Sequence, residues 1–526
     1  MEDKMKFKKF AAYIFSLLMI SSLYALEVNE KELQSAGSDT IVFINYTGPH
    51  SKIDSLQSIK KIGSDMGSVI APAKEKENRA GSSKYAVIHA VDSSIKEKLD
   101  ADIILIGGDA TVDHITNLRH IIASYLVSAY DYTESDAETI AVFVTVYNAV
   151  YRGKLDQFQA KYKDIVTKNL SQDACGLSVN YKEWPGKSQI VIPLYDINGG
   201  LSTIDTSVIT DTEVVKHMQE DDDKNIDDRK KMVDIKERES EDSSKKAQES
   251  QKQATEEKKK LVEEQKKTEE TKKTAEEAKK KAEENPDDQE LQKEAEEKQA
   301  EYEEQKEAEE EQQKKVEEAE QKATEEQQRS DKKSEEAQSE RKTIAQDQQE
   351  VIEKEIENSK APSAYAIKLT DEGSLLSGLI KVNTSNGEII QSSPVTYIRN
   401  RTMFQAGENF IAIAGENSGN GAVKLVLLSP DTMEITAESN EIVAEDSVLI
   451  QDDGSFYCII QNEDKWVVGK YDSSLNLKLK GTTNVKPSTP MTITSEYIIV
   501  SGASGQVKIL KKADLSPVES ETMDEK

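Results

Sequence analysis

The distribution of hydrophobic and polar positions divides the chain into three parts. Residues 26–218 contain apolar runs with the periods of strands and helices. Residues 219–358 contain almost no aromatic residue and no glycine, and residues 362–526 alternate short apolar runs with polar turns. The middle part cannot bury a core, although nearly all of its residues favour helix. The pattern predicts a multidomain chain, in which a charged α-helical or coiled-coil spacer separates two globular domains.

Four apolar runs in the first part are typical of strands. They span Thr40–Tyr46, Lys84–Val91, Asp102–Gly107 and Ser188–Leu194. β-branched residues are frequent in them, and turn-forming residues bound them. The run DIILIG is apolar throughout, which predicts a central strand covered on both faces.

Apolar residues at helical spacing predict four helices in the same part. They span residues 51–67, with a stripe of Ile53, Leu56, Ile59 and Ile62, and then residues 115–130, 135–153 and 155–170. The third is expected to begin with a capping box between Ser135 and Glu138 and to end at Gly153. Together with the strands, these helices predict a small α/β domain.

The middle part carries Glu and Lys four residues apart, a spacing that stabilises an exposed helix. It also carries a weak seven-residue repeat. One heptad position is shared by Ala254, Leu261, Ala275 and Ala282, and a later one by Ala337, Ile344 and Val351. Because these side chains are mostly small, the pattern fits a single charged helix as well as a coiled coil.

Asn285 and Pro286 interrupt the helical pattern, since a proline inside a helix costs about 3 kcal/mol. Asn285 suits a helix cap, Pro286 suits the first helical position, and acidic residues follow. We therefore expect two helices that meet near Asn285, each roughly 80 to 110 Å long. They either fold back as an antiparallel hairpin or continue as a kinked rod.

The last part repeats a unit of strand, polar turn and strand. Copies begin at Lys381, Leu428, Tyr471 and Lys512, and a propeller blade has about this period. The apolar runs NFIAIAG, SFYCIIQ and EYIIVSG lie between them. We predict an all-β, propeller-like domain of four blades, with an incomplete propeller or a curved sheet as the alternative.

The first 25 residues have the pattern of a signal peptide. Four lysines between residues 4 and 9 precede an apolar run from Ala11 to Ala25, which is short for a membrane-spanning helix. Cleavage is expected near Ala25, with an uncleaved anchor as the alternative. No cysteine lies nearby, and no second apolar stretch is long enough to span a bilayer. We expect an exported protein, periplasmic or envelope-associated, that is not a lipoprotein and has no transmembrane span in its mature form.

The composition narrows the class of partner. A formal net charge of −30 disfavours nucleic acid and anionic lipid, which attract cationic surfaces. Cys175 and Cys458 fall in different predicted domains, so we expect two buried, unpaired thiols. Neither the cysteines nor the five histidines have the spacing of zinc ligands. No cofactor and no metal are therefore expected.

One stretch of the first domain offers weak ligand-binding candidates. Gly107 and Asp109 lie between an apolar strand and a helix, where a ligand can meet a helix N-terminus. Asp113 and His114 follow, a pair capable of acid–base chemistry. The patterns GxGxxG, HExxH and GxSxG are absent, and Pro185–Ser188 lacks the first glycine of a phosphate-binding loop. No catalytic residue is predicted.

Three long strings resemble one known family. They are TNLRHIIASYLVSAYDYTESDAETIAVFVTVYNAVYRGKLDQF (Thr116–Phe158), GLSVNYKEWPGKSQIVIPL (Gly176–Leu194) and FINYTGP (Phe43–Pro49). They resemble the N-terminal domain of the spirochaetal 83/100 kDa antigen family, over roughly residues 26–217. The family layout of signal peptide, head, charged helical middle and β-rich tail is also similar. The resemblance implies a spirochaete envelope or periplasmic location and an antigenic history, and brings no catalytic or binding residues.

These observations lead to one principal hypothesis and two others. In the principal one, the protein is a non-enzymatic structural spacer or scaffold of the cell envelope, and its two ends bind envelope proteins. Self-association through the helical segment is left open. The second is a ligand-binding or hydrolytic first domain acting on cell-wall material near Gly107, Asp109, Asp113 and His114. The third is a surface antigen that binds host molecules.

Overall fold

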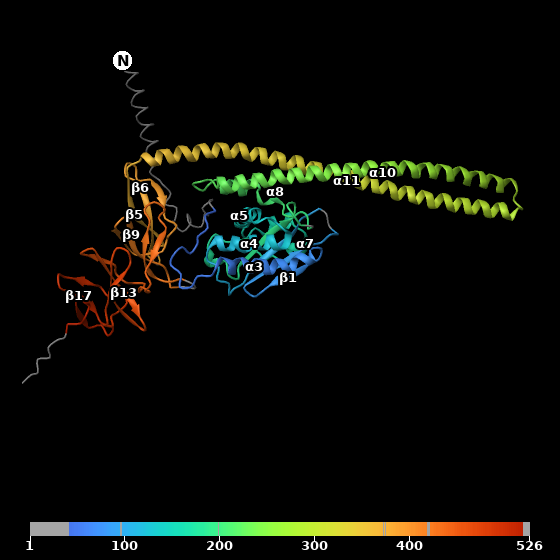
Figure 1. Cartoon of the computed structure of the whole chain (residues 1–526). Coiled ribbons are helices and arrows are strands. Elements are labelled where there is room, and N and C mark those ends of the chain that lie inside the picture. Colours follow the sequence, from blue (N-terminus) through green and yellow to red (C-terminus); the bar gives the residue numbers. More distant parts are fainter. Residues whose placement is uncertain are drawn as a thin grey trace, which may run out of the picture. The chain divides into compact units, whose positions relative to one another are not determined.

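The chain contains an α/β region, then two long helices, then a β-rich region (Figure 1). We call these the head (residues 42–218), the hairpin (residues 226–360) and the tail (residues 363–518). The computed structural model describes residues 41–94, 97–197, 199–371, 373, 375–417 and 421–518. The predicted signal peptide lies outside the described residues.

A four-stranded antiparallel sheet forms the centre of the head, in the order β1–β2–β3–β4. The strands are β1 Asn78–Gly81, β2 Tyr85–Ala90, β3 Asp100–Ile106 and β4 Ser188–Leu194. The last three are confirmed predictions, and β3 is central as its apolar run required. Strand β1 is polar and contains no apolar run, so the sequence pattern did not predict it.

The predicted strand at residues 40–46 is wrong in its described portion. Only Ile44 pairs there, through an isolated bridge to Asn180. Val42 is 56% exposed and Ile44 47% exposed. A β-branched run without a partner strand along its length does not form a ladder, whatever its propensity.

Nine helices are described before the tail. They are α3 Leu56–Ile70, α4 Ile115–Tyr130, α5 Glu134–Val150, α6 Leu155–Lys161, α7 Asp164–Thr167, α8 Thr206–Ile209, α9 Thr212–Met218, α10 Ile226–Glu284 and α11 Gln289–Lys360. Two short 3₁₀ turns, Ala71–Ala73 and Tyr181–Glu183, complete the helical elements of the described residues. The predicted helix at 115–130 is confirmed without a shift.

Two details of the predicted helices are wrong. The cap of α5 is Thr133, which accepts a hydrogen bond from the Asp136 amide at 3.2 Å, so the Ser135 capping box does not form. The helix expected over residues 155–170 breaks into α6 and α7 at Tyr162. That residue is extended and forms a bridge with Leu99, because its ring is buried in the core and the backbone turns to place it there.

Helix α3 packs on α4 through glycines rather than through its apolar stripe. A Cβ atom on Gly63 would lie 2.0 Å from the Ile121 carbonyl, and one on Gly67 would lie 2.7 Å from the Tyr125 carbonyl. Ile53 and Leu56 of the predicted stripe are exposed instead. Small residues four apart allow the two backbones to approach closely, and this decides which face of α3 is buried.

Helices α10 and α11 lie side by side as an antiparallel hairpin (Figure 1). Of the predicted heptad positions, Ala254, Leu261, Ala275, Ala282, Ala337 and Ile344 are buried, whereas Val351 is only partly buried. The folded-back alternative is therefore confirmed over the kinked rod. One detail differs: Asn285 ends α10, and the cap of α11 is Asp288, which accepts from the amides of Glu290 and Leu291. Pro286 thus lies in the turn.

Three sheets make up the tail. The first has seven strands: β5 Ser363–Asp371, β6 Leu376–Asn383, β7 Ile389–Ser392, β8 Ile398–Ala406, β9 Asn409–Ala414, β10 Lys424–Leu428 and β11 Ile435–Glu438. The second contains β12 Ile450–Asp452, β13 Ser455–Asn462, β14 Lys465–Tyr471 and β15 Leu477–Lys480. The third contains β16 Thr492–Ile493, β17 Tyr497–Ser501 and β18 Val507–Lys511. The predicted strands in NFIAIAG, SFYCIIQ and EYIIVSG are confirmed as β9, β13 and β17.

The sequence repeat of the tail recurs as a structural turn. It follows β6, β10, β14 and β18, with a positive φ at Gly387, Met433, Leu475 and Leu515. The sheets stack through apolar side chains: Phe456 and Cys458 face the first sheet, while Tyr457 and Ile459 face the third. The run SFYCIIQ is apolar without alternation because both faces of β13 are covered. The described sheets form neither a closed propeller nor a closed barrel.

The tail follows the hairpin almost without a linker. Helix α11 ends at Lys360, Ala361 is extended, and β5 begins at Ser363. Pro362 stands between them and cannot continue a helix. Two residues, Ala361 and Pro362, therefore connect α11 to β5.

A buried charged pair lies between the head sheet and α4. His89 Nδ1 donates to Asp102 Oδ1 at 2.6 Å, and His89 Nε2 donates to the Lys74 carbonyl at 2.7 Å. The other carboxylate oxygen, Asp102 Oδ2, accepts from the hydroxyls of Tyr125 and Tyr130 at 2.5 and 2.6 Å. Acceptors at both ring nitrogens favour the cationic form of the imidazole. Burial alone lowers the pKa of His89, but the hydrogen bond and charge of Asp102 outweigh it, and the pKa is raised.

This pair predicts a pH-dependent stability. A raised folded pKa stabilises the fold at pH values below the ordinary histidine pKa of 6.5, and the contribution is lost as the pH rises through the folded pKa. The free energy of unfolding of the wild type should therefore fall relative to His89→Gln as the pH rises above about 6.5. Urea unfolding from pH 5 to 9 measures this difference. If the free energies of unfolding of the two proteins changed with pH in the same way, the pair would not contribute to stability as a charged pair.

Candidate functional site

The four residues proposed from the sequence lie at three different places. The Gly107 amide donates to the Lys84 carbonyl at 2.8 Å, and Asp109 Oδ2 accepts from the Ser83 hydroxyl at 3.1 Å. Both contacts hold the turn after β3 against the start of β2. Gly107 also lines a cavity of about 350 Å³.

Asp113 and His114 point to different partners. Asp113 Oδ2 lies 3.2 Å from His50 Nε2, and both residues line a cavity of about 520 Å³ beside α3. His114 caps α4, because its Nδ1 accepts from the Thr116 amide at 3.1 Å. Burial lowers the pKa of His114, against the charge of Asp113, which suits a ring nitrogen that acts as an acceptor. The structure thus joins Asp113 with His50, a residue 63 positions away that no sequence spacing indicates.

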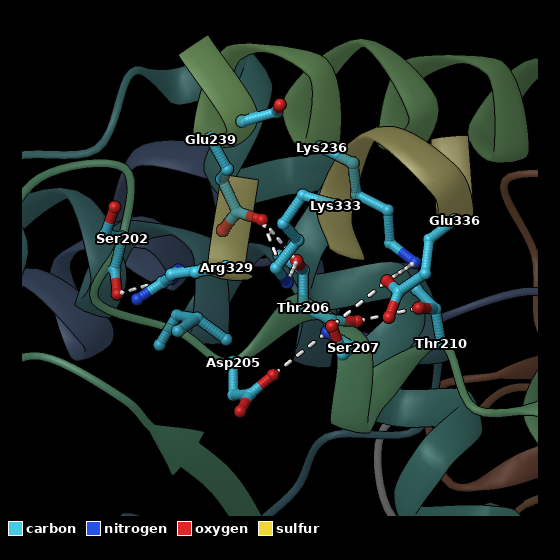
Figure 2. Close-up of polar contacts among 12 residues, drawn as sticks. Ser202, Asp205, Thr206, Ser207, Thr210, Lys236, Glu239, Arg329, Lys333 and Glu336 are labelled. Atoms are coloured by element: carbon cyan, nitrogen blue, oxygen red, sulfur yellow. Dashed lines mark hydrogen bonds and ion pairs between the residues drawn. The ribbon is translucent and has the colours of Figure 1, made fainter. Parts of the chain in front are cut away.

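A separate polar cluster lies where the hairpin meets the head (Figure 2). Thr206 belongs to α8 of the head, Glu239 to α10 and Lys333 to α11. The Thr206 hydroxyl donates to Glu239 Oε2 at 2.5 Å and accepts from Lys333 Nζ at 2.5 Å. Lys333 Nζ lies 3.1 Å from the same carboxylate, and both charged side chains are almost fully buried. One hydroxyl of the head thereby joins both helices of the hairpin.

A second triad lies beside the first. Glu336 Oε2 of α11 accepts from Lys236 Nζ of α10 at 2.7 Å and from the Ser207 hydroxyl of α8 at 3.0 Å. The dashed lines in Figure 2 mark these contacts. We call the six residues of the two triads the clamp: Thr206, Ser207, Lys236, Glu239, Lys333 and Glu336.

Two arginines extend the clamp to other parts of the head. The Arg329 guanidinium of α11 stacks on the ring of Tyr195 at 3.5 Å and donates to the Ser202 carbonyl at 3.4 Å. Arg238 of α10 makes two hydrogen bonds to Asp136 of α5, at 2.5 and 3.0 Å. Planar guanidinium groups suit such stacked and bidentate contacts.

Burial dominates the electrostatics of the clamp. It raises the pKa of Glu239 in spite of the charge of Lys333, and it lowers the pKa of Lys236 in spite of Glu336. Both shifts oppose ionisation, so each charge depends on its partner. Removal of one member from such a pair leaves a buried charge without compensation.

The clamp is suited to holding elements together and not to catalysis. A hydroxyl beside a lysine amine is a known nucleophile–base arrangement. Here, however, Thr206 and Glu239 are fully buried and Lys333 is 3% exposed, so a substrate has no access to the hydroxyl. Among the described residues, no group of His, Cys, Asp and Glu side chains is arranged to hold a metal ion.

Sequence reasoning missed the clamp because its charges were attributed to a solvated surface. A signal for it exists. Lys333, Glu340 and Asp347 are spaced by seven and alternate with the apolar positions Ala337 and Ile344 along the same stretch of α11. In a two-stranded coiled coil that second core position is apolar. Charged residues at this second core position indicate that this stretch of α11 faces a polar partner in addition to α10.

Comparison with known proteins identifies one family. A family model described as Borrelia P83/100 protein matches residues 30–491, which is most of the chain. A search of curated proteins finds no match. The helices of the described residues include none long and apolar enough to cross a bilayer.

The clamp predicts an asymmetric response to mutation. Lys333→Met leaves Glu239 buried without its cation and should lower the free energy of unfolding by about 3–5 kcal/mol. The double variant Glu239→Leu/Lys333→Met removes both charges and should recover most of that loss. Lys342→Met, at an exposed position of the same helix, is the matched control and should leave stability unchanged. Chemical denaturation measures all three, and equal losses in the single and double variants would contradict the paired-charge interpretation.

Proposed function

The chain belongs to the Borrelia P83/100 protein family, an antigen family. On that premise, we propose that it is a non-enzymatic exported protein of the cell envelope. We propose that it acts as a structural spacer whose two ends bind other proteins. The hairpin is the spacer, the clamp fixes its base to the head, and the tail offers a second binding end. Export and a periplasmic or envelope-associated location belong to this proposal.

The proposal rests on one observation: the hairpin makes polar contacts with the head at its base and not along residues 251–324 of the described chain. Its base is joined to the head through the clamp and through Arg238 and Arg329. In the described part of the chain, residues 251–324 form hydrogen bonds and ion pairs only within the hairpin, such as Gln312 to Glu257 and Lys258 to Glu320. An arm attached at one end holds its other end at a fixed distance.

The distal arm is built to keep its shape. Helix α10 has 59 residues and α11 has 72, so the hairpin is about 90 Å long at 1.5 Å per residue. Buried alanines allow the helices to pack closely, and exposed Lys–Glu pairs such as Lys273–Glu269 and Lys315–Glu311 support each helix from outside. Each such pair contributes only a few tenths of a kcal/mol, and the arm contains many of them.

The architecture of the tail favours its role as the second protein-binding end of the spacer. The tail contains three sheets and a repeated turn, and repeated units of this kind present neighbouring loops as one broad surface. We assign this surface to an envelope protein partner. Hydrolysis of cell-wall material has no comparable support, because Gly107, Asp109 and Asp113 are not gathered at one cavity.

The spacer function predicts dependence on length rather than on sequence. Deletion of residues 262–282 and 289–309 removes three heptads from each helix, keeps the turn and the heptad register, and shortens the arm by about 30 Å. Crosslinking in intact cells, followed by mass spectrometry, should show loss of envelope proteins normally crosslinked to the chain.

The matched control keeps the full length and exchanges exposed Lys and Glu residues within the same two segments. It should retain the crosslinks of the wild type. Retention of every crosslink by the shortened chain, with head and tail folded, would exclude the spacer function.

A further inference from the structure

A cavity of about 620 Å³ lies between the head and the base of the hairpin, next to the clamp. Its walls come from α5, α8 and α9 of the head and from both hairpin helices. Side chains of the clamp that Figure 2 shows, Lys236, Ser207 and Glu336, form part of its lining. Its volume is within the range of small-molecule sites, which often occur between structural units.

One residue of the cavity lining, Arg229, carries a buried donor without a partner. The Arg229 side chain is fully buried; its Nε donates to Glu340 at 2.6 Å and its Nη1 to Asp347 at 2.7 Å. Arg229 Nη2 has no hydrogen-bond partner among the described residues. Buried polar groups are nearly always hydrogen-bonded, so this amino group calls for an acceptor oxygen.

The lining limits the charge of a ligand. It contains as many cationic as anionic side chains: Arg229, Lys216 and Lys236 against Asp211, Glu336 and Glu340. A ligand with a net charge would leave an excess charge in a partly buried cavity, which is unfavourable. Four apolar side chains complete the walls: Phe143, Val215, Met232 and Val233.

We propose that this cavity binds a short zwitterionic peptide. The peptide carboxylate accepts from Arg229 Nη2, since hydrogen bonds between charged groups are the strongest that this donor can form. The peptide ammonium faces the acidic side chains, and small apolar side chains contact Phe143 and Met232. A neutral sugar would satisfy the donor but would leave the apolar wall without a matching surface.

Such a site goes beyond the spacer function. Because the cavity has walls from the head and from the hairpin, a bound peptide contacts both. A ligand that binds only the docked arrangement stabilises that arrangement. The attachment of the arm thereby becomes responsive to peptide concentration.

Titration calorimetry of the full-length chain with trialanine tests the proposal. Saturable binding of one equivalent is expected. Ser339→Trp places a large side chain in the cavity from an exposed helical position and should weaken binding by at least about tenfold, equivalent to 1.4 kcal/mol. Gln338→Trp, at the next exposed position and outside the cavity lining, is the matched control and should bind as the wild type does.

Two further measurements test the assigned contact. Arg229→Lys keeps the charge but loses the planar donor, and should weaken trialanine binding by about tenfold. Trialanine amide, which lacks the carboxylate, should bind the wild type correspondingly less. The proposal is overturned by absence of saturable binding at millimolar trialanine, by unchanged binding to Ser339→Trp, or by binding of N-acetylglucosamine in place of trialanine.

Discussion

The compensation of buried charge at the base of the hairpin is the interaction on which the rest of the structure depends. Lys333 and Glu239 lie on different helices, and Thr206 of the head stands between them. Apolar contacts would tolerate a shift of α10 along the head, whereas these charged groups have only one arrangement in which all are paired. We regard the clamp as a device for position more than for stability, since an apolar replacement of a buried pair is often no less stable.

The hairpin shows how a chain poor in apolar residues can still fold back on itself. Small side chains such as Ala254 and Ala275 let the two helices approach closely, and dispersion contacts then accumulate along a seam of many residues. The tail solves the same problem differently. It stacks apolar sheets, so that β13 is covered on both of its faces.

Local patterns predicted much of the fold. The order of the three regions, the strands β2 to β4, the helix α4 and the heptad positions of the hairpin all follow from periodicity and composition. The failures have a common origin in tertiary contacts. Tyr162 breaks a helix because its ring belongs in the core, and Gly63 replaces an isoleucine stripe as the contact face because backbones approach there. The clamp escaped prediction because its members are distant in sequence and are individually ordinary surface charges.

The course of the chain through the hairpin has a mechanical consequence. The head leads into α10 at Ile226, and α11 leads into the tail after Lys360, so both connections lie at the open end of the hairpin. Tension between head and tail therefore acts to unzip the two helices from that end. The ion pairs nearest that end are Lys354 to Asp222 and Lys224 to Glu350. Arg229 to Asp347 and the buried pair of Glu239 with Lys333 lie further along the hairpin. The weak alanine seam of the distal arm bears no load until these have broken.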